Sequence, residues 1–193
     1  MKKFELTNEF VTNVFGTKLF RIRALVEFGD VEAGELGGYV EKESNLGHDD
    51  NAWVYDNAWV SGNAQVSGNA LVYGNAWVYG DARVYGDALV YDNAQVSGDA
   101  RVCGDARVCG NGDYAYAHGF GSVNRTTTFF RLKDGGVGVR CGCFYGTLAQ
   151  FRDKIRETHG ETKKAQEYLM LADLMELRFE EDENEVGNRK YVE

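Results

Sequence analysis

The chain has 193 residues, a formal net charge of −9, 44% hydrophobic residues, 24 glycines and no proline. This length allows one extended domain with a cap at each end. The negative charge argues against nonspecific binding of nucleic acid, and no apolar run approaches the length of a membrane span. Because no charged and then apolar leader opens the chain, we expect a cytoplasmic protein without a membrane partner.

Residues 1–39 contain strand-like sequence, Phe4 to Leu6 and Leu19 to Val26, interrupted by glycines. Val40 and Leu46 then begin a spacing of six residues, but the next step, to Val54, is eight. We therefore expect an N-terminal β cap over residues 1–39, followed by an atypical first rung and a short insertion around residues 48–50.

From Asn51 to Gly110 one phrase of six residues, Ala-x-Val-x-Gly/Asp-Asn/Asp, occurs ten times without a break. In an extended segment alternate side chains face opposite ways, so Ala52 and Val54 share one side while Trp53 and Tyr55 share the other. The Gly, Asn and Asp residues that follow accept the backbone angles of a corner. Each phrase therefore predicts one short strand and one corner.

Three phrases, or 18 residues, would close a triangular coil filled by Val and Ala, with the next coil about 4.8 Å above it in parallel register. The sequence thus predicts a mainly β fold, a solenoid of about four to five coils over residues 40–124. Tyr114 and Phe120 keep the spacing of six, with Gly112 and His118 where Ala is expected. Larger inward side chains there are expected to end the stack.

The repeats resemble the hexapeptide repeats of left-handed parallel β-helix proteins, in which an aliphatic residue is followed four positions later by a small one, as in Val54 and Ala58. The left-handed sense is what this resemblance implies. The flanks, residues 19–25, 34–40 and 141–146, are also similar to phage and bacterial hexapeptide-repeat proteins labelled polymer-forming or transferase-like. A phage or prophage origin follows from this second resemblance alone.

The rest of the chain predicts a second cap. Thr126 to Leu132 and Val137 to Cys141 are typical of a β-hairpin, within residues 125–145. Within residues 146–193, Thr147 is a predicted N-cap of one helix, and a second helix begins near Thr162. The second helix places an apolar stripe at Ala165, Tyr168, Leu169, Ala172, Leu174, Met175 and Phe179. The helices are expected to pack on the hairpin or on another subunit, and the acids Glu180, Glu181, Asp182, Glu183 and Glu185 are expected to form a solvated or disordered tail.

Because each coil has 18 residues, outward residues whose numbers differ by 18 lie above one another, and this rule sorts them into three faces. The first face carries Trp53, Tyr55, Leu71, Tyr73, Leu89 and Tyr91, ending at Arg107 and Cys109; the second carries Trp59, Ser61, Trp77, Tyr79, Gln95 and Ser97; the third carries Gln65, Ser67, Arg83, Tyr85, Arg101 and Cys103. Six large apolar residues favour the first face as a contact between subunits. A stiffening ladder, or a surface under the terminal helices, is the alternative. The resemblance implies a trimer.

Aromatic rings beside arginines suit a flat anionic ligand such as a nucleotide. If the subunits assemble, aromatic residues of one would lie near Arg83 and Arg101 of another. The alternative is that these arginines are solvated and screened by the corner residues Asp81, Asp87, Asp99 and Asp105. The candidate binding residues are Trp53, Tyr55, Trp59, Tyr73, Trp77, Tyr79, Arg83, Tyr85, Tyr91 and Arg101.

The sequence does not favour an enzyme. Acyltransferases that share the hexapeptide repeat use a histidine base and a loop that leaves the coil, but no loop interrupts residues 51–110. Of the three histidines, His48, His118 and His159, only His118 could serve as a base. No cofactor is implied. The thiols are expected to be structural, and no metal site is expected, although His118, Cys141 and Cys143 form a loose candidate.

We therefore expect a non-enzymatic, oligomeric scaffold that binds a small anion or a host protein, for example one that sequesters a nucleotide signal of host antiviral defence in the host cytoplasm. One alternative is a degenerate acyltransferase. Another is a structural protein that forms filaments by stacking its first and last coils.

Overall fold

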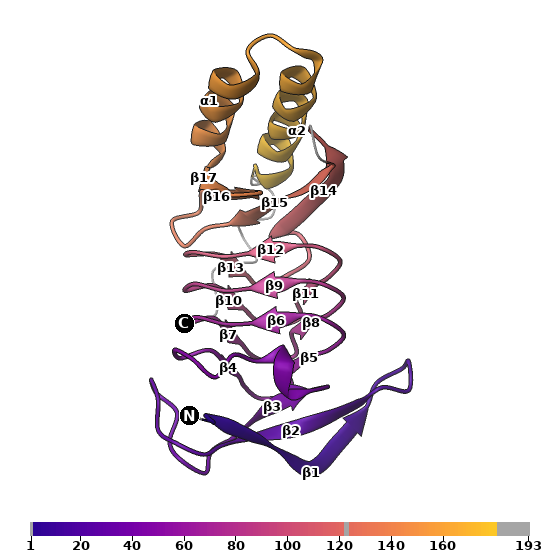
Figure 1. Cartoon of the computed structure of the whole chain (residues 1–193), viewed down its shortest axis with the longest axis vertical. Coiled ribbons are helices and arrows are strands. Elements are labelled where there is room, and N and C mark those ends of the chain that lie inside the picture. The colour runs from indigo at the N-terminus through magenta and orange to yellow at the C-terminus, as the bar shows by residue number, and fades with distance from the viewer. Residues whose placement is uncertain (1, 122–123, 181–193) are drawn as a thin grey trace.

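The computed structural model describes residues 2–121 and 124–180. A coil of short parallel strands forms the middle of an elongated molecule (Figure 1). An antiparallel β sheet closes one end of the coil, and a second sheet with two helices closes the other. The predicted order of cap, coil and cap is therefore confirmed.

Ten two-residue strands build the coil, one from each phrase. Each pairs in parallel with the strand 18 residues away, as in Trp53↔Leu71 and Arg83↔Arg101. The first face is the sheet β4-β7-β10-β13, the second face contains β5-β8-β11, and the third face is β6-β9-β12. The strands are Trp53–Val54 (β4), Trp59–Val60 (β5), Gln65–Val66 (β6), Leu71–Val72 (β7), Trp77–Val78 (β8), Arg83–Val84 (β9), Leu89–Val90 (β10), Gln95–Val96 (β11), Arg101–Val102 (β12) and Arg107–Val108 (β13).

Val and Ala fill the bore of the coil, as the repeat predicts. The ten Val and ten Ala of the phrases all have 0% exposure. Corner glycines such as Gly62 and Gly86 have positive φ, and Asp56 and Asp92 adopt the same conformation at equivalent corners. The result is a parallel β-helix of about four turns. Its handedness stays a prediction from the resemblance.

The N-terminal cap is a three-stranded antiparallel sheet of β1 (Phe4–Thr12), β2 (Lys18–Ala24) and β3 (Leu36–Val40). Its last strand continues the coil, because Tyr39 pairs in parallel with Trp59 and Val40 with Val60. Phe4 and Ile22 are fully buried in one core cluster with the coil residues. The cap is thus the first rung of the second face as well as its cover.

A short 3-10 helix, Glu43–Asn45, lies at the open edge of the third face. Leu46 forms a parallel bridge to Val66, as the spacing of six predicts. The fully buried Asn45 donates through Nδ2 to the carbonyl oxygens of Gly62 and Ala64, at 3.1 and 2.8 Å. One side chain thereby satisfies carbonyl groups that an additional strand would otherwise pair.

The C-terminal cap contains a four-stranded antiparallel sheet of β14 (Tyr114–Phe120), β15 (Arg125–Arg131), β16 (Val137–Cys141) and β17 (Phe144–Thr147). The predicted hairpin is β15 and β16. The expectation that Tyr114, His118 and Phe120 continue the coil was wrong, because β14 pairs antiparallel with β15. His118 consequently lies outside the bore, with 58% of its side chain exposed.

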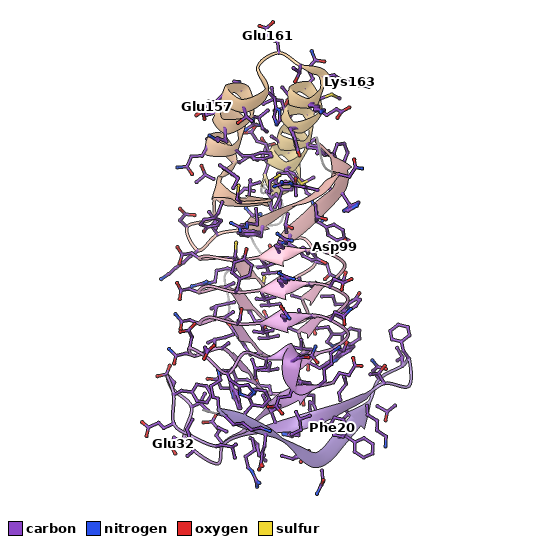
Figure 2. The ribbon with its side chains drawn as sticks, in the orientation of Figure 1. Phe20, Glu32, Asp99, Glu157, Glu161 and Lys163 are labelled. Carbon is purple, nitrogen blue, oxygen red and sulfur yellow. The ribbon has the colours of Figure 1, made fainter. Side chains whose placement is uncertain are left out.

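Two helices, α1 (Leu148–His159) and α2 (Lys163–Phe179), complete this cap. Thr147 caps α1, as predicted, and Thr162 caps α2, which begins where it was expected; both side chains accept a hydrogen bond from a backbone N–H group. Phe151, Ile155 and Ala172 are buried in one core cluster with Phe129 and Val139 of the sheet. Figure 2 shows Glu161, in the turn between the helices, and Lys163, at the start of α2, near the far tip of the molecule.

The helices lie on the cap sheet and not on the first face of the coil (Figure 1), so they do not cover its aromatic residues. The stripe of α2 is confirmed at Ala165, Tyr168, Ala172, Met175 and Phe179. Leu169 is partly buried, and Leu174 is 53% exposed, contrary to the prediction. Of the predicted acidic tail, Glu180 is described and exposed, and residues 181–185 lie outside the described residues.

Candidate functional site

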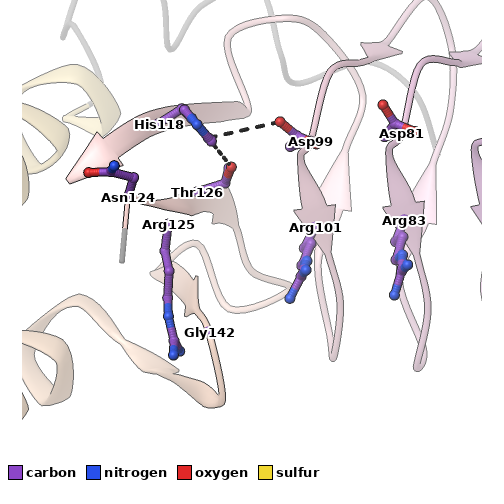
Figure 3. Close-up of a pocket in the computed structure, with 9 residues that line it drawn as sticks. All are labelled: Asp81, Arg83, Asp99, Arg101, His118, Asn124, Arg125, Thr126 and Gly142. Carbon is purple, nitrogen blue, oxygen red and sulfur yellow. Dashed lines mark hydrogen bonds and ion pairs between the residues drawn. The ribbon is translucent and has the colours of Figure 1, made fainter. Parts of the chain in front are cut away.

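A row of arginines follows the third face from the coil into the C-terminal cap. Arg83 and Arg101 occupy the same position on β9 and β12 and pair in register, so their side chains leave the coil about 4.8 Å apart. Arg125, the first residue of β15, continues this row beyond Arg101 (Figure 3). We call these three residues the arginine row.

The arginine row borders a hollow of about 600 Å³ between the coil and the cap. In Figure 3 the guanidinium groups of Arg83, Arg101 and Arg125 all point to the same side. The carboxylates of Asp81 and Asp99 lie beside them along the coil. The lining residues are Asp81, Arg83, Asp99, Arg101, His118, Asn124, Arg125, Thr126 and Gly142.

His118, on β14 of the cap, lies between Asp99 of the coil and Thr126 of β15. Its Nδ1 lies 2.8 Å from the hydroxyl of Thr126 and 3.9 Å from a carboxylate oxygen of Asp99 (Figure 3). The hollow therefore offers guanidinium donors on one side and carboxylate acceptors with an imidazole on the other.

A smaller hollow, of about 280 Å³, lies on the other side of Arg83 and Arg101 and is also lined by Tyr85 and Arg140. The guanidinium carbon of Arg140 lies 6.0 Å from the centroid of the Tyr85 ring. Burial and a hydrogen bond with Cys103 raise the pKa of Tyr85 to about 12, so its phenol is neutral at physiological pH. The buried Nε of Arg140 has no hydrogen-bond partner among the described residues.

The charges of the arginine row are not balanced by direct contacts. Among residues 2–121 and 124–180, no carboxylate lies within ion-pair distance of Arg83, Arg101 or Arg125. Elsewhere arginines are paired: Arg152, for example, contacts Asp173 and Glu176 at 2.8 Å. On a chain with a net charge of −9, the row is thus a local concentration of positive charge.

The other predicted binding residues do not join this site. Trp53 has 0% exposure, because Phe4 and Phe28 of the N-terminal region pack edge-on against its ring at 6.2 and 5.3 Å. Its position on the first face is outward from the bore but covered, so it cannot contact a ligand. Trp59 and Trp77 pack together on the second face at 4.5 Å, and Tyr79 is partly buried on the same face.

The first face retains a partly exposed ladder of Tyr55, Leu71, Tyr73, Leu89 and Tyr91. Tyr73 and Tyr91 stack in parallel, with ring centroids 5.1 Å apart and an interplanar angle of 8°. Burial raises the pKa of Tyr91 to about 12, with a smaller contribution from Cys109. We call these five residues the aromatic ladder.

The remaining histidines have structural contacts. His48 stacks on Phe4, its Nδ1 accepts the backbone N–H of Lys3, and its Nε2 then donates to Glu43 at 2.9 Å. His159, the last residue of α1, stacks on Tyr168 at 6.0 Å. Within the described part of the chain, no three His, Cys, Asp or Glu side chains gather as metal ligands.

Sequence reasoning missed Arg125, Arg140, Asn124 and Thr126 as site residues. Arg83 and Arg101 could be placed because the period of 18 puts them in one column. Arg125 and Arg140 lie outside the repeats, and their position depends on how the cap sheet sits on the last coil. No local signal in the sequence identifies that arrangement.

Comparison with known proteins supports the fold of the coil. The model of a family described as "YdcK Beta solenoid repeat" matches residues 64–80, 82–98 and 94–110. No curated protein matches the chain. Neither helix of the described residues has the length and hydrophobicity needed to cross a membrane. The repeat match, which covers part of the coil, and the coil of about four turns both support a β-helix built from hexapeptide-like repeats.

Proposed function

We propose that this β-helix protein is a non-enzymatic binding scaffold that takes up a small anionic ligand, such as a nucleotide, at the arginine row. The observation that carries this proposal is that Arg83, Arg101 and Arg125 line one hollow without an ion pair to any described residue. Guanidinium groups are planar donors that match phosphate and carboxylate oxygens in pairs. A bound anion would relieve the repulsion between neighbouring arginines.

The coil is a suitable support for such a site. Backbone hydrogen bonds join successive coils beneath the arginines, for instance from Arg83 N to Ala100 O at 2.9 Å and from Tyr85 N to Val102 O at 3.0 Å. Because this ladder fixes the Cα positions of Arg83 and Arg101, binding would order only their side chains. Such preorganisation reduces the entropy lost on binding.

The biological role that we propose is sequestration of a host molecule. The similarity of the flanks to phage proteins supports an origin in a phage or prophage, and the arginine row supports an anionic target. A nucleotide signal of antiviral defence in the host cytoplasm meets both conditions.

The proposal is tested by thermal unfolding of the full chain with a panel of nucleotides and cyclic nucleotides. A ligand that binds only the folded chain raises Tm. We expect a rise with at least one nucleotide, and its loss in Arg101→Gln. Arg156→Gln is the matched control, because Arg156 is exposed on α1 and pairs with Asp153. No shift with any member of the panel would contradict the proposal.

We further propose that the scaffold associates with copies of itself through the aromatic ladder. The ladder is straight because its residues repeat every 18 positions, and the terminal helices leave it uncovered. A straight apolar row of this kind can pack against the same row on a second copy of the chain. The resemblance to hexapeptide-repeat proteins favours a trimer. End-to-end stacking into filaments has less support, because both ends of the coil are covered.

The alternative is a degenerate acyltransferase. One observation favours it: His118, the candidate base, is exposed in the same hollow as the arginine row and lies near Asp99. Incubation with acetyl-CoA and amine or hydroxyl acceptors, alongside His118→Ala, distinguishes the two functions. Turnover by the wild type that the variant loses would replace the binding scaffold with the enzyme.

A further inference from the structure

We infer that the ligand of the arginine row carries at least two phosphate groups at separate positions, together with hydroxyl groups that donate hydrogen bonds. This inference rests on the proposed function, because it names the class of anion that the same hollow would bind.

The first argument is the direction of the three guanidinium groups. In Figure 3 they point the same way and follow one another along the axis of the coil, and they do not converge on one point. A converging set would enclose a single phosphate. A parallel set, with a rung spacing of about 4.8 Å between Arg83 and Arg101, favours negative charge distributed along the axis.

The second argument is that the distance between coil and cap is fixed. The backbone N–H of Arg101 donates to the hydroxyl of Thr128 on β15, at 2.9 Å, and Thr128 is fully buried. Lys133 N donates to Asp105 O at 3.0 Å, and Ala106 forms a bridge to Leu132. The backbone of β15, which carries Arg125, is therefore set against β12 before a ligand arrives, so the row favours a limited range of separations between two anionic groups.

The third argument comes from the acidic side of the hollow. Asp81 and Asp99 also line it, and carboxylates accept hydrogen bonds but repel phosphate. A chain of phosphates alone would meet this repulsion and would offer the carboxylates no hydrogen-bond donor. A sugar or nucleoside bisphosphate can direct its phosphates to the arginines and its hydroxyl groups to the carboxylates. We therefore favour a phosphorylated polyol over inorganic polyphosphate.

Titration calorimetry of the full chain with three adenosine nucleotides tests this inference. Adenosine monophosphate has one phosphate, adenosine diphosphate has two adjacent ones, and adenosine 3′,5′-bisphosphate has two on different carbons of the ribose. We expect the bisphosphate to bind about tenfold more tightly than either of the others, as one additional charge-assisted contact would provide. Inorganic tripolyphosphate should bind more weakly than the bisphosphate.

Arg125→Gln locates the preference. It should reduce the affinity for the bisphosphate about tenfold and leave monophosphate binding, which Arg83 and Arg101 can support, nearly unchanged. Arg156→Gln should alter neither, and Tm of each variant without ligand reports whether it is folded. Equal affinity for the three nucleotides, or tighter binding of the diphosphate or tripolyphosphate, would overturn this inference while preserving an anion site. Binding of none of them would remove both proposals.

Discussion

At the N-terminal end of this coil, single side chains make hydrogen bonds that a further strand would otherwise make. Asn45 donates to two carbonyl oxygens of the edge coil, Gly62 O and Ala64 O. Lys3 has the same role nearby: its Nζ donates to Asp50 O at 3.2 Å and to Ala52 O at 2.8 Å. Buried carbonyl groups without a partner are costly, so one polar residue at each position replaces a missing strand.

The lysine makes stability depend on pH. Burial lowers the pKa of Lys3 to about 8, although Asp50 and Asp49 oppose the shift. In the unfolded chain the pKa of a lysine is about 10.4. Between these values the unfolded chain holds a proton that the folded chain has released. Rising pH therefore stabilises the folded chain in this range.

We predict that Tm of the wild type, measured relative to Lys3→Met, rises between about pH 8 and pH 10. The variant should also be less stable, by about 1–3 kcal/mol, because two carbonyl groups lose their donor. Lys164→Met, at an exposed lysine of α2, is the control and should follow the wild type. Parallel curves of Tm against pH for the wild type and Lys3→Met would contradict the role assigned to Lys3.

At the scale of the element, the packing of the bore limits the size of the side chain at each inward position. Ala82 lies between Ala64 and Ala100 of the neighbouring coils, and all three have 0% exposure. A larger side chain there would displace backbone that is held by hydrogen bonds on both sides.

Ala82→Leu should therefore destabilise the chain by about 1–3 kcal/mol, seen as a lower urea midpoint. Gln95→Leu is the matched control, since equivalent outward positions carry Leu71 and Leu89. Its effect should stay within about 0.5 kcal/mol. Equal losses in the two variants would mean that the bore is more tolerant than its packing indicates.

The repeat explains why the coil could be predicted from the sequence and β14 could not. Ten phrases fix the inward residues, the corners and the register of 18, and the structure confirms each of these. Tyr114 and Phe120 keep the spacing of six, but Tyr116 stands where the phrase has its corner glycine, and His118 stands where it has Ala. Alternation within β14 fits an antiparallel strand equally well. Spacing without the rest of the phrase was therefore insufficient evidence for another coil.

In the candidate site, too, the residues inside the repeat could be predicted from the sequence and those outside it could not. Arg83, Tyr85 and Arg101 belong to the repeat and were placed correctly on one face. Trp53 was assigned to an open surface, but Phe4 of β1 and Phe28 of the loop after β2 cover it. Arg125 and Arg140 enter the site because β15 and β16 cross the end of the coil. These contacts join elements far apart in the sequence, and local patterns do not encode them.

For the whole molecule, the aromatic ladder and the net charge act in opposite directions. Contact between two ladders would bury Leu71, Leu89 and the stacked rings of Tyr73 and Tyr91, which favours association. Each copy brings a net charge of −9, which opposes association and is screened by salt. We therefore predict that the mass in solution exceeds that of one chain and that the assembled fraction increases with ionic strength.

Light scattering coupled to size-exclusion chromatography measures this directly. Leu71→Glu places a carboxylate in the centre of the ladder, between Trp53 and Leu89 in register, and should shift the protein to single chains. Gln95→Glu adds the same charge on the second face and should leave the mass unchanged. A single-chain mass for the wild type at every salt concentration would instead make the ladder a device that stiffens the coil. An assembly that Leu71→Glu leaves intact would assign the contact to another face.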